Sequence, residues 1–167
     1  MRLDLYGRPW AVGLYKPFRY HMLRGGRGSG KSIAASECMV YRCSRPGKRR
    51  RAVAGREFGN AIDESIREDL VSAIRYLRVE SDWEPRFRDF VNKRNGSRIF
   101  LRGSSSNIQS ARGWRNIDYV YVDEAQYLRD STWEQLRNSV RGGEARTGGE
   151  FFLNINPQDP NLSLIHI

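Results

Sequence analysis

The sequence of 167 residues is poor in cysteine, in lysine and in long apolar runs. Its two cysteines, Cys38 and Cys43, are five positions apart, a spacing that suits neither a zinc site nor a redox pair. No apolar run approaches the roughly 20 residues that span a membrane, and residues 1–10 lack the apolar core of a signal peptide. We therefore expect a soluble, cytosolic protein with reduced cysteines and no membrane segment.

Arginine is the residue type in excess. Lys+Arg number 29 against 19 for Asp+Glu, which gives a formal net charge of +10, and only four of the basic residues are lysines. This excess favours a polyanionic partner such as nucleic acid, although a solvated arginine-rich surface has the same composition. The length is enough for one domain with its own core.

Strand and helix patterns alternate along the chain. Short apolar runs predict strands at 18–23, 51–56, 119–122 and 151–155, and a hairpin at 87–102 turns at Asn95-Gly96. Helices are predicted at 31–43, then over Ile62–Leu77 with Asn60 as N-cap and Asp63 at the third helical position, and after a capping box at 131–134. The alternation predicts an α/β domain with a mostly parallel sheet flanked by helices.

A phosphate-binding loop is the strongest motif. Residues 25–32 match the pattern G-x-x-x-x-G-K-[ST] (Walker A) at every fixed position, which are Gly25, Gly30, Lys31 and Ser32. Its variable positions are filled by Gly26, Arg27, Gly28 and Ser29. In such a loop, backbone N–H groups and the following helix N-terminus hold phosphates. Lys31 would reach the β- and γ-phosphates, and the Ser32 hydroxyl would ligate Mg²⁺. A glycine-rich turn that binds nothing is the alternative.

Two carboxylates, Asp123 and Glu124, end the apolar run 119–122. In phosphate-loop enzymes an aspartate there holds Mg²⁺. Because neighbouring side chains on a strand alternate, we expect Glu124 to point the other way and to deprotonate the attacking water. About ninety residues separate Gly30 from Asp123, which suits the class in which another strand lies between the phosphate-loop strand and the acidic strand. This is the additional-strand catalytic-glutamate (ASCE) class of P-loop NTPase, here with a β-hairpin insertion.

Asn156 and Pro157 follow the last predicted strand. An asparagine at that strand end faces the nucleotide crevice of such sheets and would bond the γ-phosphate or the water. Asn-Pro also begins ordinary turns, so a simple turn remains the alternative.

Together these pieces resemble the ATPase domain of the large terminase subunit of tailed bacteriophages. The resemblance runs from about Phe18 to Pro157. Besides the motifs above it includes Val53-Ala-Gly-Arg56-Glu57, Asp63-Glu-Ser65-Ile66, Asn95-Gly96-Ser97, Phe100-Leu-Arg-Gly103, Ala111-Arg112-Gly113, Val122-Asp-Glu-Ala-Gln126 and Ser139-Val-Arg141.

The resemblance implies a Mg²⁺-dependent ATPase that powers translocation of double-stranded DNA into a procapsid in the host cytoplasm. It implies that Arg27 stabilises charge on the γ-phosphate and that Asn156-Pro157 couples hydrolysis to DNA movement. It also implies a homo-oligomeric ring on the portal protein and a small terminase subunit as partners. Large terminases usually continue into a nuclease domain, to which nothing here corresponds. We therefore expect 1–167 to be one ATPase domain truncated at its C-terminus, without nuclease activity.

Other positions leave alternatives open. Arg112, Trp114 and Arg115 would contact DNA or form an ordinary surface loop, and the basic run from Arg45 to Arg51 would bind phosphates or be a solvated turn. The adenine pocket is expected near the N-terminal segment, at Tyr15 or Phe18, and His21 is expected to be structural. A helicase-like ATPase and a basic DNA-binding module without hydrolysis are the rival functions.

Overall fold

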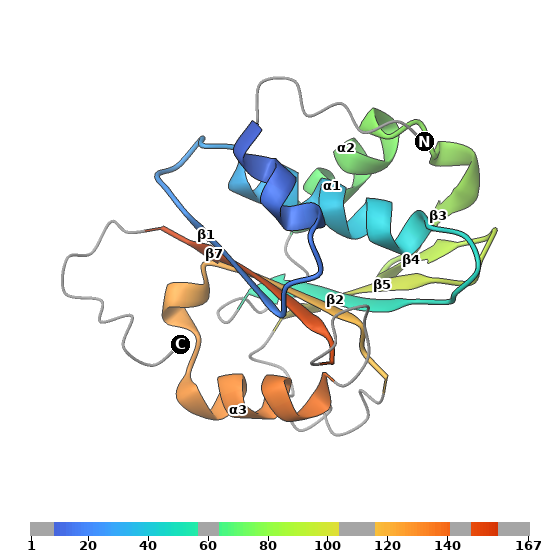
Figure 1. Cartoon of the computed structure of the whole chain (residues 1–167). Coiled ribbons are helices and arrows are strands. Elements are labelled where there is room, and N and C mark those ends of the chain that lie inside the picture. The colour runs from blue at the N-terminus through green and yellow to red at the C-terminus, as the bar shows by residue number, and fades with distance from the viewer. Residues whose placement is uncertain (1–8, 57–63, 104–115, 141–147, 157–167) are drawn as a thin grey trace.

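The computed structural model describes residues 9–56, 64–103, 116–140 and 148–156. These residues form a sheet of seven strands in the order β1-β7-β6-β2-β5-β4-β3 (Figure 1). The strands are β1 Tyr20–Arg24, β2 Arg51–Arg56, β3 Trp83–Pro85, β4 Asp89–Asn92, β5 Arg98–Gly103, β6 Tyr119–Asp123 and β7 Glu150–Ile155. From β1 to β5 in that order the strands are parallel, whereas β4 and β3 are antiparallel.

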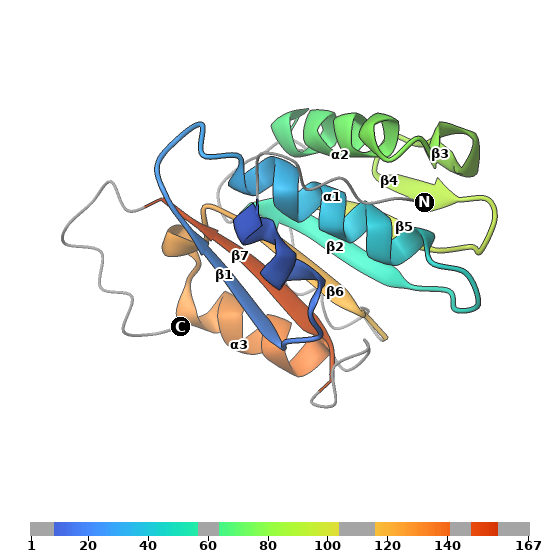
Figure 2. The same ribbon diagram turned by 45° about the horizontal axis from the view of Figure 1, so that its top comes forward.

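Helices cover both faces of the sheet. The α-helices are α1 Lys31–Ser44, α2 Glu64–Tyr76 and α3 Asp130–Ser139, and the 3₁₀ helices are η1 Pro9–Tyr15, η2 Glu80–Asp82 and η5 Ala125–Tyr127. Helices α1, α2 and η1 lie on one face, and α3 lies on the other (Figures 1 and 2). No helix among the described residues is both long and apolar enough to cross a membrane.

The two faces have separate apolar cores. Met39 of α1 and Leu70 of α2 pack on one face, and Trp133 of α3 packs against Phe151 on the other. Because both faces are covered, every residue of β6 and β7 is buried. This explains why these strands are mostly apolar along their length rather than alternating between apolar and polar residues.

The parallel strands bring their carboxyl ends to one edge of the sheet. At this edge β1 ends at Arg24, β2 at Arg56, β6 at Asp123 and β7 at Ile155. Strand β7 lies between β1 and β6, as the ASCE class requires. The predicted fold class is therefore confirmed, including the hairpin, whose turn residue Gly96 has φ +73°.

Local boundaries differ from the sequence predictions. The capping box at 131–134 is wrong, because α3 begins at Asp130 after an extended Arg129 with no side-chain cap. Trp133 N bonds Arg129 O at 2.9 Å, so the helix begins earlier than that motif indicates. η1 and β3 were not expected, since neither has a strong periodic pattern. Asn60, Ile62 and Asp63 lie outside the described residues.

Candidate nucleotide and metal site

The loop after β1 turns on glycines that take the left-handed conformation. Gly28 has φ +74° and Gly30 has φ +79°, values that residues with a Cβ rarely adopt. Gly30 is also the N-cap residue of α1, so the loop leads directly into the positive end of that helix. The local sequence thus builds, at the carboxyl edge of the sheet, a turn of the kind that binds anions in other proteins.

The Lys31 ammonium group is held by its own loop. Its Nζ donates to Gly25 O at 2.5 Å, to Gly26 O at 2.8 Å and to Ser29 Oγ at 3.0 Å. An ammonium group has three donors, so these contacts use its full capacity. A bound phosphate would have to take over at least one of these bonds.

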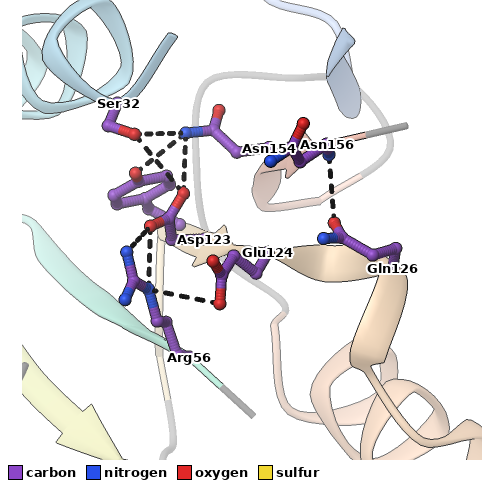
Figure 3. Close-up of polar contacts among 8 residues, drawn as sticks. Ser32, Arg56, Asp123, Glu124, Gln126, Asn154 and Asn156 are labelled. Atoms are coloured by element: carbon purple, nitrogen blue, oxygen red, sulfur yellow. Dashed lines mark hydrogen bonds and ion pairs between the residues drawn. The ribbon is translucent and has the colours of Figure 1, made fainter. Parts of the chain in front are cut away.

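The acidic pair meets Arg56, the last residue of β2 (Figure 3). The Asp123 Oδ2 atom accepts bonds from Arg56 Nε at 2.9 Å and from Nη2 at 2.5 Å. The same Nε lies 3.9 Å from Glu124 Oε2. The Asp123 side chain is 9% exposed and that of Glu124 is 40% exposed, so only the second carboxylate reaches well into solvent.

The expectation that the two carboxylates point in opposite directions is wrong. β6 ends at Asp123, and Glu124 takes the left-handed conformation with φ +54° and ψ +45°. Strand alternation therefore stops one residue early, and the backbone turn brings both carboxylates to the same guanidinium. A non-glycine residue in this conformation is uncommon and is found where the surrounding structure imposes it.

A second group of contacts joins Ser32 and Asp123 (Figure 3). Ser32 Oγ lies 3.4 Å from Asp123 Oδ1, although 91 residues separate them in the chain. The Asn154 Nδ2 atom lies 3.2 Å from Ser32 Oγ, 3.1 Å from Asp123 Oδ1 and 2.9 Å from the Tyr121 hydroxyl. Burial, and after it the Asp123 carboxylate, raises the pKa of Tyr121 well above its ordinary value, so this hydroxyl stays protonated.

A cavity of about 500 Å³ unites the predicted site residues. Its lining includes the side chains predicted to act on the nucleotide, the metal or the water: Arg27, Lys31, Ser32, Asp123, Glu124 and Asn156. Gly28, Ser29 and Gly30 line it too, while Gly25 and Gly26 contribute through their carbonyl bonds to Lys31. The chemical roles of these residues remain predictions.

Asn156 directly follows β7. Its backbone N–H donates to Gln126 Oε1 at 3.1 Å, which fixes the strand end against the residues after β6 (Figure 3). Its side-chain Oδ1 is buried without a hydrogen-bond partner among the described residues. Pro157 lies outside the described residues.

A second cavity of about 490 Å³ adjoins the loop from the other side and shares Ser29 and Lys31 with the first. Trp10, Phe18 and Met22 line it and are each about half exposed. Of the two residues considered for adenine, only Phe18 lines this cavity.

Tyr15 does not line this second cavity. Its ring packs edge-to-face on Tyr41 at a centroid distance of 5.3 Å.

A buried ion-pair network lies beside the second cavity. Glu150, at the start of β7, is fully buried and accepts from Arg42 Nη1 at 3.0 Å, with Nη2 2.9 Å from its other oxygen. The His21 Nε2 atom lies 3.2 Å from the same carboxylate, and its ring stacks on Phe152 at 4.6 Å. Arg42 also donates to Leu14 O at 2.9 Å, which ties η1 to α1.

Sequence reasoning missed Arg56 as a contact of Asp123 and missed Asn154 entirely. The available signals were an arginine at the end of a predicted strand and one asparagine inside the apolar run 151–155. The basic run is partly structural, because Arg50 is 5% exposed and donates to Arg45 O at 3.1 Å. Arg112, Trp114 and Arg115 lie outside the described residues.

The oxygen donors at this edge fit a magnesium ion. A hydroxyl and a carboxylate are hard ligands, and Mg²⁺ in phosphate-transfer sites is held by one or two such groups together with phosphates and water. Within the described ranges there is no cluster of three or more His, Cys, Asp or Glu that would form a self-contained metal centre. Ser32 and Asp123 would hold the ion.

Comparisons with known proteins agree with this fold. The family model for the phage terminase large subunit matches residues 18–165. The large terminase of a thermophilic bacteriophage has a TM-score of 0.63 at 13% identity, over 89% of this chain and 39% of that one. The complex of that terminase with ADP gives a TM-score of 0.61 at 13% identity, with the same two coverages.

The N-terminal domain of the DNA packaging ATPase from bacteriophage phi29 has a TM-score of 0.60 at 17% identity, over 92% of this chain and 84% of that one. No curated protein sequence matches. The chain therefore spans about two-fifths of the thermophilic phage terminase and most of an isolated N-terminal packaging-ATPase domain.

Proposed function

Because the chain belongs to the phage terminase large subunit family, we propose that it carries the ATP-hydrolysing site of a motor that moves double-stranded DNA into a procapsid. The observation that carries the proposal is the contact between Ser32 and Asp123. It brings the end of the phosphate-binding loop to the end of the acidic strand, in a cavity that Lys31 and Glu124 also line. The solved terminase with bound ADP supports a nucleotide as the ligand of this fold.

The residues divide the chemistry among them. Lys31 and the amides of the loop bind the β- and γ-phosphates, and Arg27 neutralises charge that develops on the γ-phosphate. Glu124 takes a proton from the attacking water, for which its 40% exposure and its place at the cavity wall are suited. Asn156 bonds the γ-phosphate or the water and reports hydrolysis to the DNA-moving parts.

Magnesium, when bound, would offset the negative charge of the phosphates and the charge that develops during transfer. Ser32 and Asp123 are the residues that we assign to it. Arg56 keeps Asp123 in place from the opposite oxygen.

The second cavity is proposed to receive the adenine base, with Phe18 and Trp10 as its apolar walls. Because this cavity and the first share Lys31, one nucleotide would extend from the base side to the γ-phosphate side of the loop.

The motor function extends beyond this chain. We propose duplex DNA as the substrate moved, a homo-oligomeric ring on the portal protein as the working assembly, and a small terminase subunit as a further partner, all in the host cytoplasm. The net charge of +10 suits contact with DNA. DNA cutting is not part of the function proposed for residues 1–167.

Nucleotide binding tests the core of the proposal directly. Thermal unfolding is recorded with and without Mg²⁺ and a non-hydrolysable ATP analogue, for the wild type and for Lys31→Ala. At about 100 times Kd a ligand adds roughly 2.7 kcal/mol, which raises Tm by about 5–10 °C for a domain of this size. A folded wild-type protein without any shift would contradict the proposal.

Hydrolysis with duplex DNA then separates the rival functions. A packaging motor is expected to hydrolyse ATP faster with duplex DNA and to leave a strand-separation substrate intact. Strand separation would favour a helicase-like ATPase, and salt-sensitive DNA binding without any nucleotide effect would favour a basic DNA-binding module.

A further inference from the structure

Asn154 is a polar residue near the carboxyl end of the otherwise largely apolar strand β7. That strand pairs with β1 on one side and with β6 on the other. The Asn154 side chain is buried, since the residue is only 1% exposed. Burying an amide costs free energy unless its polar atoms are bonded, so the contacts of this residue indicate what it does.

The amide orientation of Asn154 follows from its partners. A carboxylate only accepts hydrogen bonds, so the atom 3.1 Å from Asp123 Oδ1 must be the donating Nδ2. The same nitrogen lies near the hydroxyls of Ser32 and Tyr121, each of which can accept, so its two N–H groups are shared among three acceptors. One NH₂ group therefore connects the first turn of α1 with the end of β6.

Neither Ser32 nor Asp123 is fixed by its own element alone. Ser32 is in the first turn of α1, and Asp123 is the last residue of β6. The 3.4 Å between Ser32 Oγ and Asp123 Oδ1 is long for a hydrogen bond between oxygens. The Asn154 amide is closer to each of these atoms, at 3.2 Å and 3.1 Å, and holds them side by side.

We infer that Asn154 is a positioning residue for magnesium: its amide keeps the Ser32 hydroxyl and the Asp123 carboxylate together as one preformed pair of oxygen ligands. The inference rests on the proposed function and extends it to a residue that does not itself have to touch the ion. Partners that orient metal ligands typically change metal affinity by 10–100-fold when they are removed. Tyr121 supports the amide through its hydroxyl, 2.9 Å from Nδ2.

The second polar atom of the amide, Oδ1, points away from the Ser32–Asp123 pair (Figure 3). Asn154 Oδ1 is buried and has no hydrogen-bond partner within the described part of the chain. Buried acceptors are nearly always bonded to protein or to ordered water. An ordered water is therefore the expected donor to this oxygen.

Magnesium dependence of nucleotide binding is the measurement that tests the inference. Thermal unfolding of Asn154→Ala is followed at a fixed concentration of non-hydrolysable ATP analogue while Mg²⁺ is raised from an EDTA baseline. We expect the Mg²⁺ concentration for half of the Tm shift to rise 10–100-fold. The shift produced by the analogue in EDTA should stay as in the wild type.

Three further proteins make the result specific. Asn92→Ala removes another buried strand asparagine, one whose Oδ1 accepts from the backbone of its own turn between β4 and β5, and should leave the Mg²⁺ midpoint unchanged. Asn154→Thr keeps a side-chain donor, so its Mg²⁺ midpoint should lie between those of Asn154→Ala and the wild type. Tyr121→Phe should raise the midpoint in the same direction as Asn154→Ala, by less.

The outcomes separate the inference from the proposed function. A wild-type midpoint in Asn154→Ala would overturn the inference. If that variant does not fold, a wild-type midpoint in both Asn154→Thr and Tyr121→Phe would overturn it instead. A wild-type protein that shows no Mg²⁺-dependent shift at all would count against the proposed function.

Discussion

The guanidinium of Arg56 contacts the carboxylate of Asp123 across two adjacent strands, with Nε 2.9 Å from Oδ2. β2 and β6 pair in parallel, and their register places these two residues opposite each other. Asn154 and Ser32 lie at the other carboxylate oxygen. Both oxygens of Asp123 therefore have partners, and these contacts hold the buried carboxylate in position without a bound ion.

Replacing Arg56 by glutamine should lower the free energy of unfolding by about 1–3 kcal/mol in EDTA, because a largely buried carboxylate loses its charged partner. The loss should shrink when Mg²⁺ is present, since a second cation can then neutralise Asp123. Urea unfolding at neutral pH, with and without Mg²⁺, measures both effects.

Arg86→Gln is the matched control for this experiment. Its guanidinium lies 3.0 Å from Glu84, but both side chains are about half exposed, so no measurable loss is expected. Equal stability of Arg56→Gln and the wild type in EDTA would show that water replaces the pair at no cost.

Glu124→Gln should leave the binding of an ATP analogue unchanged and should reduce turnover by about 10²–10⁴-fold, the usual contribution of a general base. The substitution keeps the size of the side chain and one acceptor oxygen, and it removes the negative charge and the ability to accept the proton. Turnover is measured by phosphate release at saturating Mg²⁺ and duplex DNA. Turnover equal to that of the wild type would remove Glu124 from the catalytic role.

Phe18→Ala should weaken ATP-analogue binding and leave the binding of inorganic tripolyphosphate unchanged. The ring lines the cavity beside the loop, is 56% exposed, and does not line the cavity to which Asp123 belongs. Stacking on a base is worth about 1–3 kcal/mol, which corresponds to roughly 5–150-fold in Kd. Titration calorimetry measures the Kd of both ligands for the variant and the wild type. An equal loss of affinity for both ligands would show that the substitution disturbs the phosphate-binding loop and not a base pocket.

The architecture follows from the sequence wherever burial dictates the pattern. The runs 119–122 and 151–155 are continuous because helices cover both faces, and the loop glycines predict the turn from β1 into α1. Backbone reversal at Glu124 could not be predicted, since strand alternation gives no sign of where a strand ends. A role for Asn154 could not be predicted either. A single polar residue in an apolar run indicates no function until its neighbours on the adjacent strands are known.

Both thiols should be unreactive in the native protein. Cys38 and Cys43 are fully buried, and burial raises the pKa of Cys38 to about 12 and raises that of Cys43 as well. Labelling with a disulfide reagent at pH 8 should modify neither thiol in native buffer and both in denaturant. The thiol pKa values of the folded protein lie above those of the unfolded chain. The buried neutral thiols therefore contribute fully to the free energy of unfolding below about pH 8.5, and this contribution is lost as pH rises toward 12. Rapid labelling of a native thiol would contradict the closed core around α1.

The pair Arg42–Glu150 gives the sharpest test of how the N-terminal segment is held. Glu150 is fully buried between Arg42 and His21, and Arg42 also bonds the carbonyl oxygens of Leu14 and Lys16. Arg42→Met would leave that carboxylate without its main partner, and removing one side of a buried pair costs about 3–5 kcal/mol. Chemical denaturation measures the loss.

The same substitution should also loosen η1, because the guanidinium bonds Leu14 in η1 and Lys16 directly after it. Faster amide hydrogen exchange at residues 10–16 in native buffer is therefore expected, together with weaker binding of an ATP analogue, since Trp10 and Leu14 line the base-side cavity. Lys48→Met is the control, because Lys48 Nζ lies 3.7 Å from Asp118 on a side chain that is 57% exposed. An Arg42→Met protein that loses stability but keeps wild-type exchange at residues 10–16 would show that the network supports β7 alone.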